Sequence, residues 1–219
     1  MTSYENLKKD SEIISYINAA NDVLGVIGYT EHGLAHVVKT GTDASRILET
    51  LGYAERECEL AKIAGLLHDI GNCINRSGHA QNGAYLAFEL LRARNFPPDE
   101  VISVATAIGH HDEKTAAPVT PIAAALIIAD KSDVRTSRVR NKNTVFTDIH
   151  DRVNYAVFDS DIFVSKEEKL IKLTLKIDTL VCPVMEYFEI FLERMVLCKK
   201  SAAFLGCDFE LIINDTRLL

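Results

Sequence analysis

Apolar residues recur at helical spacing through the first two-thirds of the chain and predict a series of amphipathic helices. Glycine and proline residues mark where these helices end and begin. The predicted helices cover about residues 13–23, 30–51, 54–71 and 78–95, then a segment beginning at Pro97-Pro98, and finally about residues 121–138. This order of elements predicts a mostly α-helical bundle.

Two of these segments are apolar on every side. They are residues 63–67, Ile-Ala-Gly-Leu-Leu, and residues 122–129, Ile-Ala-Ala-Ala-Leu-Ile-Ile-Ala. A helix without a polar face is buried on most sides. Polar residues come directly after each segment: the pair His68-Asp69 follows the first, and Asp130 follows the second.

The pattern changes after about Arg140, where β-branched and aromatic residues become frequent. Residues 153–164 and 170–177 predict two strands of a hairpin joined by the charged turn 166–169. A long amphipathic helix is predicted after Pro183, and a short strand over residues 209–213. The fold class is therefore mostly α, with a core over residues 1–140 and a small C-terminal α+β appendage, residues 141–219, packed on that core.

Composition limits the classes of protein that remain. Hydrophobic residues form 47% and charged residues 25% of 219 residues, which is typical of a globular chain, and the net charge of −7 gives no attraction to duplex nucleic acid or an anionic membrane. Five scattered cysteines without a CxxC pair indicate reduced thiols. The chain begins without the apolar core of a signal peptide and contains no apolar stretch of membrane-spanning length, so we expect a cytoplasmic protein; a homo-oligomer is left open.

The carboxylates beside the two apolar segments indicate metal chemistry. Neither Asp69 nor Asp130 is preceded closely by a lysine or arginine, and a buried carboxylate is costly unless it is paired or bound to a metal. Imidazole and carboxylate ligands together suit divalent ions such as manganese, iron, zinc, cobalt or nickel. Asp133, one helical turn further on, is an alternative ligand to Asp130. His32 and His150 are interpreted as ordinary surface or satisfied residues.

Four sequence elements occur in an order that resembles the HD-domain superfamily of metal-dependent phosphohydrolases. They are His36, then His68-Asp69 in LLHDIG, then His110-His111 in IGHHDE, and then Asp130 in IIADKSD. The resemblance implies an HD-domain helical bundle in which His36, His68, Asp69 and Asp130 form the basic metal site. It covers about residues 30–140.

Further matches point to a two-metal branch of that superfamily, related to the HD-GYP type. His79 in GHAQNGAYL and the pair His110-His111 are similar to segments that supply additional ligands there. The chain departs from that type because the GYP portion is absent and Asn72 stands where many members carry a phosphate-contacting lysine. Specificity for a cyclic dinucleotide is therefore not expected.

The resemblance implies hydrolysis of a phosphoester in a nucleotide or another small phosphorylated metabolite. Asp69 and His68 are the expected catalytic residues, and one or two divalent ions are expected, with two favoured; Mn, Fe, Ni, Co, Zn and Mg are not distinguished. Two alternatives stay open: a di-iron oxygenase of the same fold, and a non-catalytic metal- or ligand-binding regulatory module. Basic residues that follow the predicted buried segments are candidates for phosphate binding: Lys114, Lys131, Arg135 and Arg138.

Overall fold

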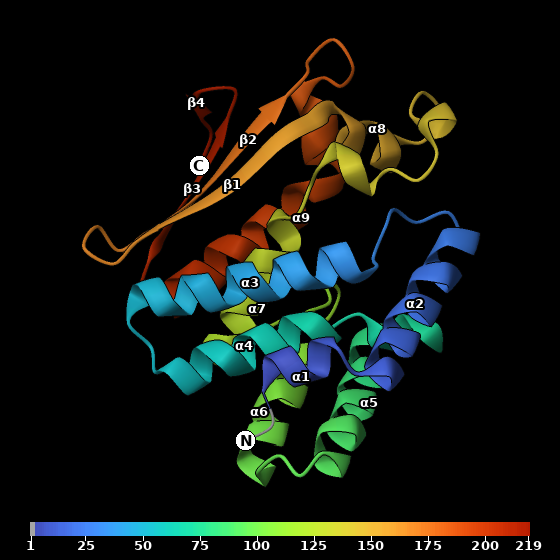
Figure 1. The fold of residues 1–219 in the computed structure, drawn as a ribbon. Coiled ribbons are helices and arrows are strands. Elements are labelled where there is room, and N and C mark those ends of the chain that lie inside the picture. Colours follow the sequence, from blue (N-terminus) through green and yellow to red (C-terminus); the bar gives the residue numbers. More distant parts are fainter. Residues whose placement is uncertain (1–2) are drawn as a thin grey trace.

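A computed structural model describes residues 3–219, and its N-terminal part is a bundle of helices (Figure 1). The predicted helical class is confirmed. Most helices occur where apolar periodicity predicts them, and the added short helix α1 precedes them. The bounds are α1 Tyr4–Lys8, α2 Ser11–Val26, α3 Leu34–Leu51, α4 Glu55–Leu67, η1 Ile70–Cys73, α5 His79–Ala93, α6 Pro98–Gly109, α7 Pro121–Ser132, η2 Thr136–Arg138 and η3 Lys142–Thr144.

The C-terminal part is a four-stranded sheet with two helices, as the predicted α+β appendage requires. Its strands lie in the order β1-β2-β3-β4; β1 and β2 are antiparallel, β2 and β3 parallel, and β3 and β4 antiparallel. The parallel pair is possible because α9 crosses from the end of β2 to the start of β3. The bounds are α8 Ile149–Ala156, β1 Val157–Ser165, β2 Leu170–Ile177, α9 Val184–Phe204, β3 Asp208–Ile213 and β4 Thr216–Arg217.

One expected strand was partly wrong. Residues 153–156 belong to α8 rather than to the first strand, which begins only at Val157. The Asp148 side chain accepts hydrogen bonds from the backbone N–H groups of His150 and Asp151 and so caps α8. A capped helix start competes with β-branched composition over such a short segment.

Three predicted helices are shorter than expected, and all three carry residues of the site at or beside the shortened end. Helix α3 begins at Leu34 instead of about residue 30, and α7 ends at Ser132 instead of about residue 138. Helix α4 likewise ends at Leu67, so that His68 and Asp69 form the turn before η1. His68 and Asp69 therefore lie in a turn, whereas His36 lies in the first turn of α3 and Asp130 in the last turn of α7.

Glycines allow α3 and α4 to approach each other closely. A Cβ atom at Gly41 would lie 2.5 Å from the backbone oxygen of Lys62, and a Cβ at Gly65 would overlap the backbone of Gly41. Such close contact between backbones is available only to glycine. It brings His36, on α3, beside His68, at the end of α4.

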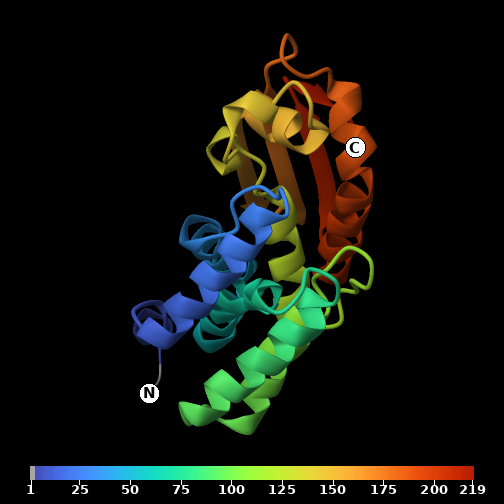
Figure 2. The same ribbon diagram turned by 90° about the vertical axis from the view of Figure 1, so that its right-hand side faces the viewer.

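The C-terminal part packs directly on the helical bundle. Figures 1 and 2 show α9 running along one face of the sheet, and it also contacts α7. The buried faces of β2 and β3 contribute Ile171, Leu173 and Leu211 to the same continuous core. The division of the chain into a core and an appendage near residue 140 stays a prediction. Within residues 3–219, no helix has the length and apolar character needed to span a membrane.

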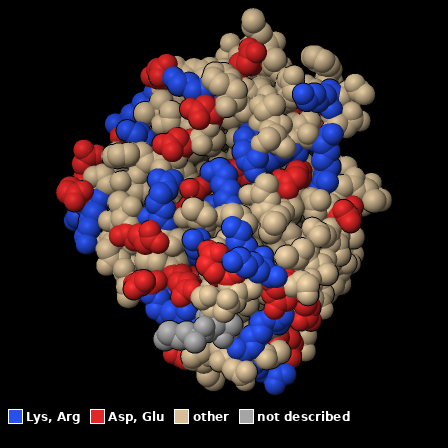
Figure 3. All heavy atoms as spheres, viewed as in Figure 1, with Lys and Arg blue, Asp and Glu red and all other residues tan. Residues whose placement is uncertain are grey.

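Basic and acidic side chains are interspersed on the face shown in Figure 3. Mixed surface charge of this kind produces little long-range field, because neighbouring charges of opposite sign screen one another. The concentration of charge that matters for chemistry lies instead inside the bundle.

The glycine contact gives a stability prediction. Gly65→Ala should lower the free energy of unfolding by roughly 1–3 kcal/mol, because the added methyl group collides with the backbone of Gly41 and forces α3 and α4 apart. Gly109→Ala is the matched control. Its new Cβ meets only Ala84 Cβ at 3.6 Å, which is an ordinary contact, so the free energy of unfolding should stay the same or rise slightly. Urea denaturation followed by circular dichroism measures both. Equal stability of the two variants would contradict the close helix contact.

Candidate metal centre

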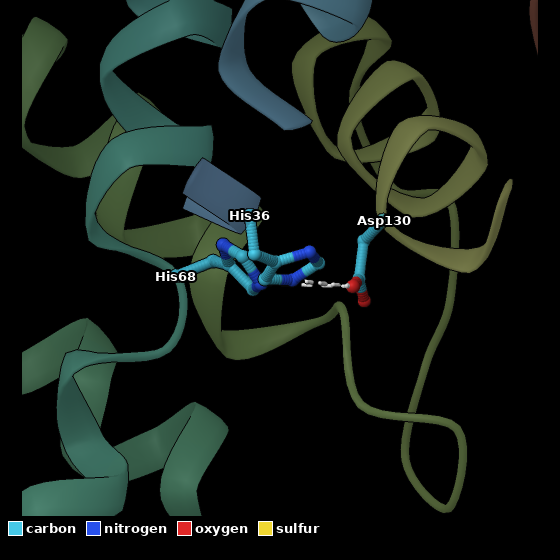
Figure 4. Close-up of side chains that lie close together, drawn as sticks. All are labelled: His36, His68 and Asp130. Atoms are coloured by element: carbon cyan, nitrogen blue, oxygen red, sulfur yellow. Dashed lines mark hydrogen bonds and ion pairs between the residues drawn. The ribbon is translucent and has the colours of Figure 1, made fainter. Parts of the chain in front are cut away.

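Three side chains from separate segments point toward one another in the interior of the bundle. Figure 4 shows His36 from α3, His68 from the turn after α4, and Asp130 from α7. His36 Nε2 lies 3.3 Å from His68 Nε2 and 3.3 Å from Asp130 Oδ1, and both imidazoles are fully buried. These atoms lie close enough to bind one ion.

Asp69 joins this group to a second pair of histidines. Its Oδ2 atom lies 3.1 Å from His68 Nε2 and 3.5 Å from His36 Nε2. Its Oδ1 atom faces the other way, 3.7 Å from His79 Nε2. His79 Nε2 is in turn 3.2 Å from His111 Nε2. The two oxygens of one carboxylate therefore face two different sets of imidazoles.

The hydrogen bonds of the outer ring nitrogens determine the tautomers of all four histidines. His68 Nδ1 donates to the backbone oxygen of Gly65 (2.8 Å), His79 Nδ1 to that of Arg76 (3.1 Å), and His111 Nδ1 to that of Ile108 (2.6 Å). A carbonyl oxygen can only accept, so each Nδ1 carries a proton, and the ring in its neutral form presents a bare lone pair at Nε2. His36 has the same arrangement, with Nδ1 donating to Asp133 Oδ2 at 2.7 Å.

These inward-facing lone pairs fit a metal ion. Two unprotonated imine nitrogens only 3.2–3.3 Å apart repel each other unless a cation or a proton lies between them. Asp69 Oδ2 is buried and lacks an aligned hydrogen-bond donor despite its nearby histidines. The imidazole and carboxylate donors gathered here suit divalent ions.

Buried charges at the centre strongly perturb its pKa values. Burial opposes protonation of His68, but the neighbouring Asp69 and Asp130 carboxylates outweigh it and raise the pKa of His68 to about 10. Burial also disfavours ionised Asp69, yet the charge of the adjacent His68 holds the pKa of Asp69 well below the usual range. Burial lowers the pKa of His111 and of His79. The centre thus keeps Asp69 and Asp130 ionised and His79 and His111 neutral, the forms that bind metals.

A second set of contacts holds these side chains in place. Asp133, considered above as an alternative ligand, instead accepts from the outer nitrogen of His36 and has a fully buried side chain. Its other oxygen accepts from Arg135 Nε at 2.8 Å. Asn72 donates to Asp69 Oδ1 at 2.9 Å. Carboxylate and amide partners of this kind orient metal-binding groups.

The structure separates the adjacent histidines His110 and His111. His111 is buried, and its ring lies 4.9 Å from His68 and 5.0 Å from His79, centroid to centroid. His110 is the residue directly after α6 and is not among the side chains brought together at the centre. His32 lines the cavity at the centre, with its ring centroid 5.3 Å from that of His36. His150 is exposed, as expected, at the start of α8.

The four candidate phosphate-binding residues have different surroundings. Lys131 is buried with Nζ 2.7 Å from Asp130 Oδ2, and Arg138 is buried in the wall of the central cavity. Lys114 lines only a wider groove outside it. Arg135 is directed to Asp133 instead.

Two arginines of the cavity wall were not among the site residues predicted from the sequence. Arg76 comes from the segment between η1 and α5, and Arg194 comes from α9 in the C-terminal part. Arg76 follows the HDIG motif by only a few residues, so proximity to the motif was an available signal. No local pattern distinguishes Arg194 from the other charged residues of its amphipathic helix.

Similarity to known proteins agrees with this geometry. Residues 33–135 match the family described as HD domain. An uncharacterized protein, MJ1020, of Methanocaldococcus jannaschii is 24% identical over 159 residues, which are 63% of this chain and 61% of that protein. Ribonuclease Y of Opitutus terrae is 36% identical over 102 residues, or 47% of this chain but only 18% of that protein.

A solved structure, a predicted HD superfamily hydrolase from an uncultured Thermotogales bacterium, is 27% identical, with a TM-score of 0.45 and coverage of 57% of this chain and 67% of that one. The chain spans less than two thirds of the length of the curated relatives that it matches. The matched residues 33–135 contain every side chain of the candidate metal centre. Over residues 33–135, just under half of its length, the chain contains an HD domain.

Proposed function

We propose that this chain hydrolyses a phosphoester of a nucleotide or another small phosphorylated metabolite at a centre that holds two divalent metal ions. The observation that carries the proposal is the orientation of Asp69, whose two oxygens face two separate pairs of imidazoles. His36, His68, Asp69 and Asp130 would hold one ion; His79, His111 and the second oxygen of Asp69 would hold the other.

The residues of the centre support hydrolysis. Metal ions bound here would activate a water molecule and polarise a phosphoryl oxygen. Asp69 would join the two halves, while Asn72 fixes the angle of its carboxylate through a hydrogen bond to Oδ1. Asp133 would keep the Nε2 lone pair of His36 directed inward by accepting the proton of Nδ1.

Basic residues in the cavity wall favour a phosphoester over other substrates. Lys131 and Arg138 both line the cavity with the metal-binding side chains. A guanidinium or ammonium group beside a metal centre can neutralise the non-bridging oxygens of a phosphoryl group as their charge changes in the transition state. The match to a protein named as a ribonuclease, which acts on phosphoesters of RNA, agrees with this chemistry without identifying the substrate.

A screen of nucleotides and phosphate monoesters with added Mn²⁺, Fe²⁺, Co²⁺, Ni²⁺, Zn²⁺ or Mg²⁺, read by phosphate release, tests the proposal. The same four histidines and two aspartates could also serve two irons in oxygen activation, so oxygen uptake by the ferrous protein is measured in parallel. Phosphate release without oxygen uptake supports the hydrolase. Oxygen uptake without hydrolysis favours the oxygenase, and stable metal binding with neither activity favours a regulatory module.

Removing the shared carboxylate should abolish catalysis. Asp69→Asn should reduce kcat at least about 1000-fold with every metal, because the neutral amide cannot join the two metal-binding halves. The control is Asp43→Asn, which removes a carboxylate from an ion pair with Lys39 and Arg46 on α3 outside the centre and should retain near-normal turnover. Turnover and circular dichroism are compared. A folded Asp69→Asn protein with normal kcat would place the active site elsewhere.

The neighbouring histidines allow a test of the second ion. Elemental analysis at saturating metal should find two ions per chain in the wild type and about one in His111→Ala, because that variant loses an imidazole facing His79. His110→Ala should keep two ions, since His110 lies outside the convergent group. One ion per chain in the wild type, or equal losses in both variants, would contradict the assignment.

The role given to Asp133 can be separated from direct metal binding. Asp133→Asn should weaken metal affinity roughly 10–100-fold, because the amide holds the imidazole of His36 less firmly in the tautomer and orientation that binds metal. It should leave the number of ions at saturation unchanged. Metal titrations of the apoprotein measure affinity and stoichiometry together. Loss of a whole ion would show that Asp133 is itself a ligand, and wild-type affinity would show that it has no role.

A further inference from the structure

A groove of about 610 Å³ adjoins the central cavity and is shared between the two parts of the chain. The helical bundle contributes Tyr29, from the loop before α3, and Arg76. The C-terminal side contributes Asn154 from α8, and Phe191 and Arg194 from α9. A groove of this volume suits a small metabolite. Residues beyond the matched HD domain therefore form part of the wall around any substrate.

The inner cavity carries more basic than acidic side chains although the whole chain has a net charge of −7. Its acidic residues are Asp69, Glu113 and Asp130. Its basic residues are Arg76, Lys131, Arg138 and Arg194. Divalent ions at the metal centre would add to this local positive charge. A site with such a surplus attracts a dianionic group.

Arg194 is held in a position suited to bind an anion. Its Nε atom lies 2.6 Å from Glu113 Oε1, and its guanidinium carbon lies 4.2 Å from the centre of the Phe191 ring. The ion pair engages the Nε side of a planar group that has five N–H donors, so the two terminal nitrogens can serve another acceptor. Ring stacking and an ion pair together reduce the side-chain freedom that would be lost on binding a ligand.

Glu113 connects Arg194 to the metal centre. Lys131 Nζ lies 3.5 Å from Glu113 Oε1 and 2.7 Å from Asp130 Oδ2. The positions of Asp130 and Arg194 are therefore coupled through a short chain of alternating charges. These charges lead from α7, through the segment that precedes it, to α9, that is, from the HD domain to the C-terminal part.

Arg76, in the segment between η1 and α5, lines the same cavity as Arg194. Its Nη1 atom lies 3.3 Å from Asn72 Oδ1 and 3.4 Å from His79 Nε2, and its guanidinium carbon lies 5.0 Å from the centre of the Tyr29 ring. Arg138 differs because it already donates to the backbone oxygens of Glu31 (2.9 Å) and Asp133 (2.7 Å). Arg76 and Arg194 are thus the two arginines whose contacts leave them best suited to a ligand.

Resting on the proposed function, we propose that Arg194 and Arg76 bind the phosphate group of the substrate, so that α9 of the C-terminal part completes the active site. Guanidinium groups from two directions would each donate to phosphate oxygens, a geometry that arginine provides and lysine does not. The remainder of the substrate would lie in the groove, between Tyr29 on one side and Asn154 on the other.

Binding of inorganic phosphate to the manganese-loaded full chain tests this assignment apart from activity. Arg194→Met keeps the aliphatic stem on Phe191 but removes the charge, and it should raise the calorimetric Kd for orthophosphate roughly 10-fold or more. Arg194→Lys should cause a smaller rise, because it keeps the charge and loses the planar donors. Arg152→Met is the matched control: Arg152 also pairs with a glutamate, Glu186, within the C-terminal part, and should leave the Kd unchanged.

Circular dichroism and manganese content are measured first for each variant, so that unfolding or metal loss is recognised. With any ester that the screen identifies, Arg194→Met should raise KM more than it lowers kcat. A folded, manganese-loaded Arg194→Met protein with wild-type phosphate affinity would overturn the assignment, as would a wild type that binds no orthophosphate. Phosphate binding that depends on Arg194 without hydrolysis of any ester would contradict only the proposed function.

Discussion

Burial of Asp69 among histidines is the constraint on which the rest of the centre depends. An ionised carboxylate in the interior is costly unless charges or hydrogen bonds compensate for lost hydration. Here His68 lies beside one oxygen and Asn72 donates to the other. The surrounding helices must therefore bring compensating groups to this carboxylate. The glycine contact between α3 and α4 brings His36 within 3.5 Å of Asp69 Oδ2.

Backbone carbonyls do much of the positioning. His68, His79 and His111 each donate from Nδ1 to the oxygen of a residue three positions earlier in the chain. Because local backbone geometry at helix ends determines these bonds, the inward lone pairs are prepared before any ligand arrives. Only His36 relies on a distant side chain, Asp133, and that carboxylate is itself held by Arg135. The centre therefore combines local preorganisation with one long-range contact.

Charge is distributed very differently inside and outside the protein. The acidic chain as a whole offers no attraction to polyanions, while its central cavity concentrates basic side chains beside the metal centre. Local fields in a partly buried site are less screened than those at the surface. Recognition of a small anion can therefore coexist with a net negative charge. The ion pair between Glu113 and Arg194 extends this field into the C-terminal part.

The sequence by itself determined the helical class, the small C-terminal sheet and the grouping of His36, His68, Asp69 and Asp130, because these depend on local periodicity and on short motifs. Tertiary structure decided which of two adjacent histidines faces inward, since the exact end of α6 sets the direction of His111. It also placed Asp133 behind His36 rather than at the centre. Arg194 could not be predicted because its partner Glu113, in the segment between α6 and α7, is distant in sequence, and only the packing of α9 on the helical bundle brings the two together.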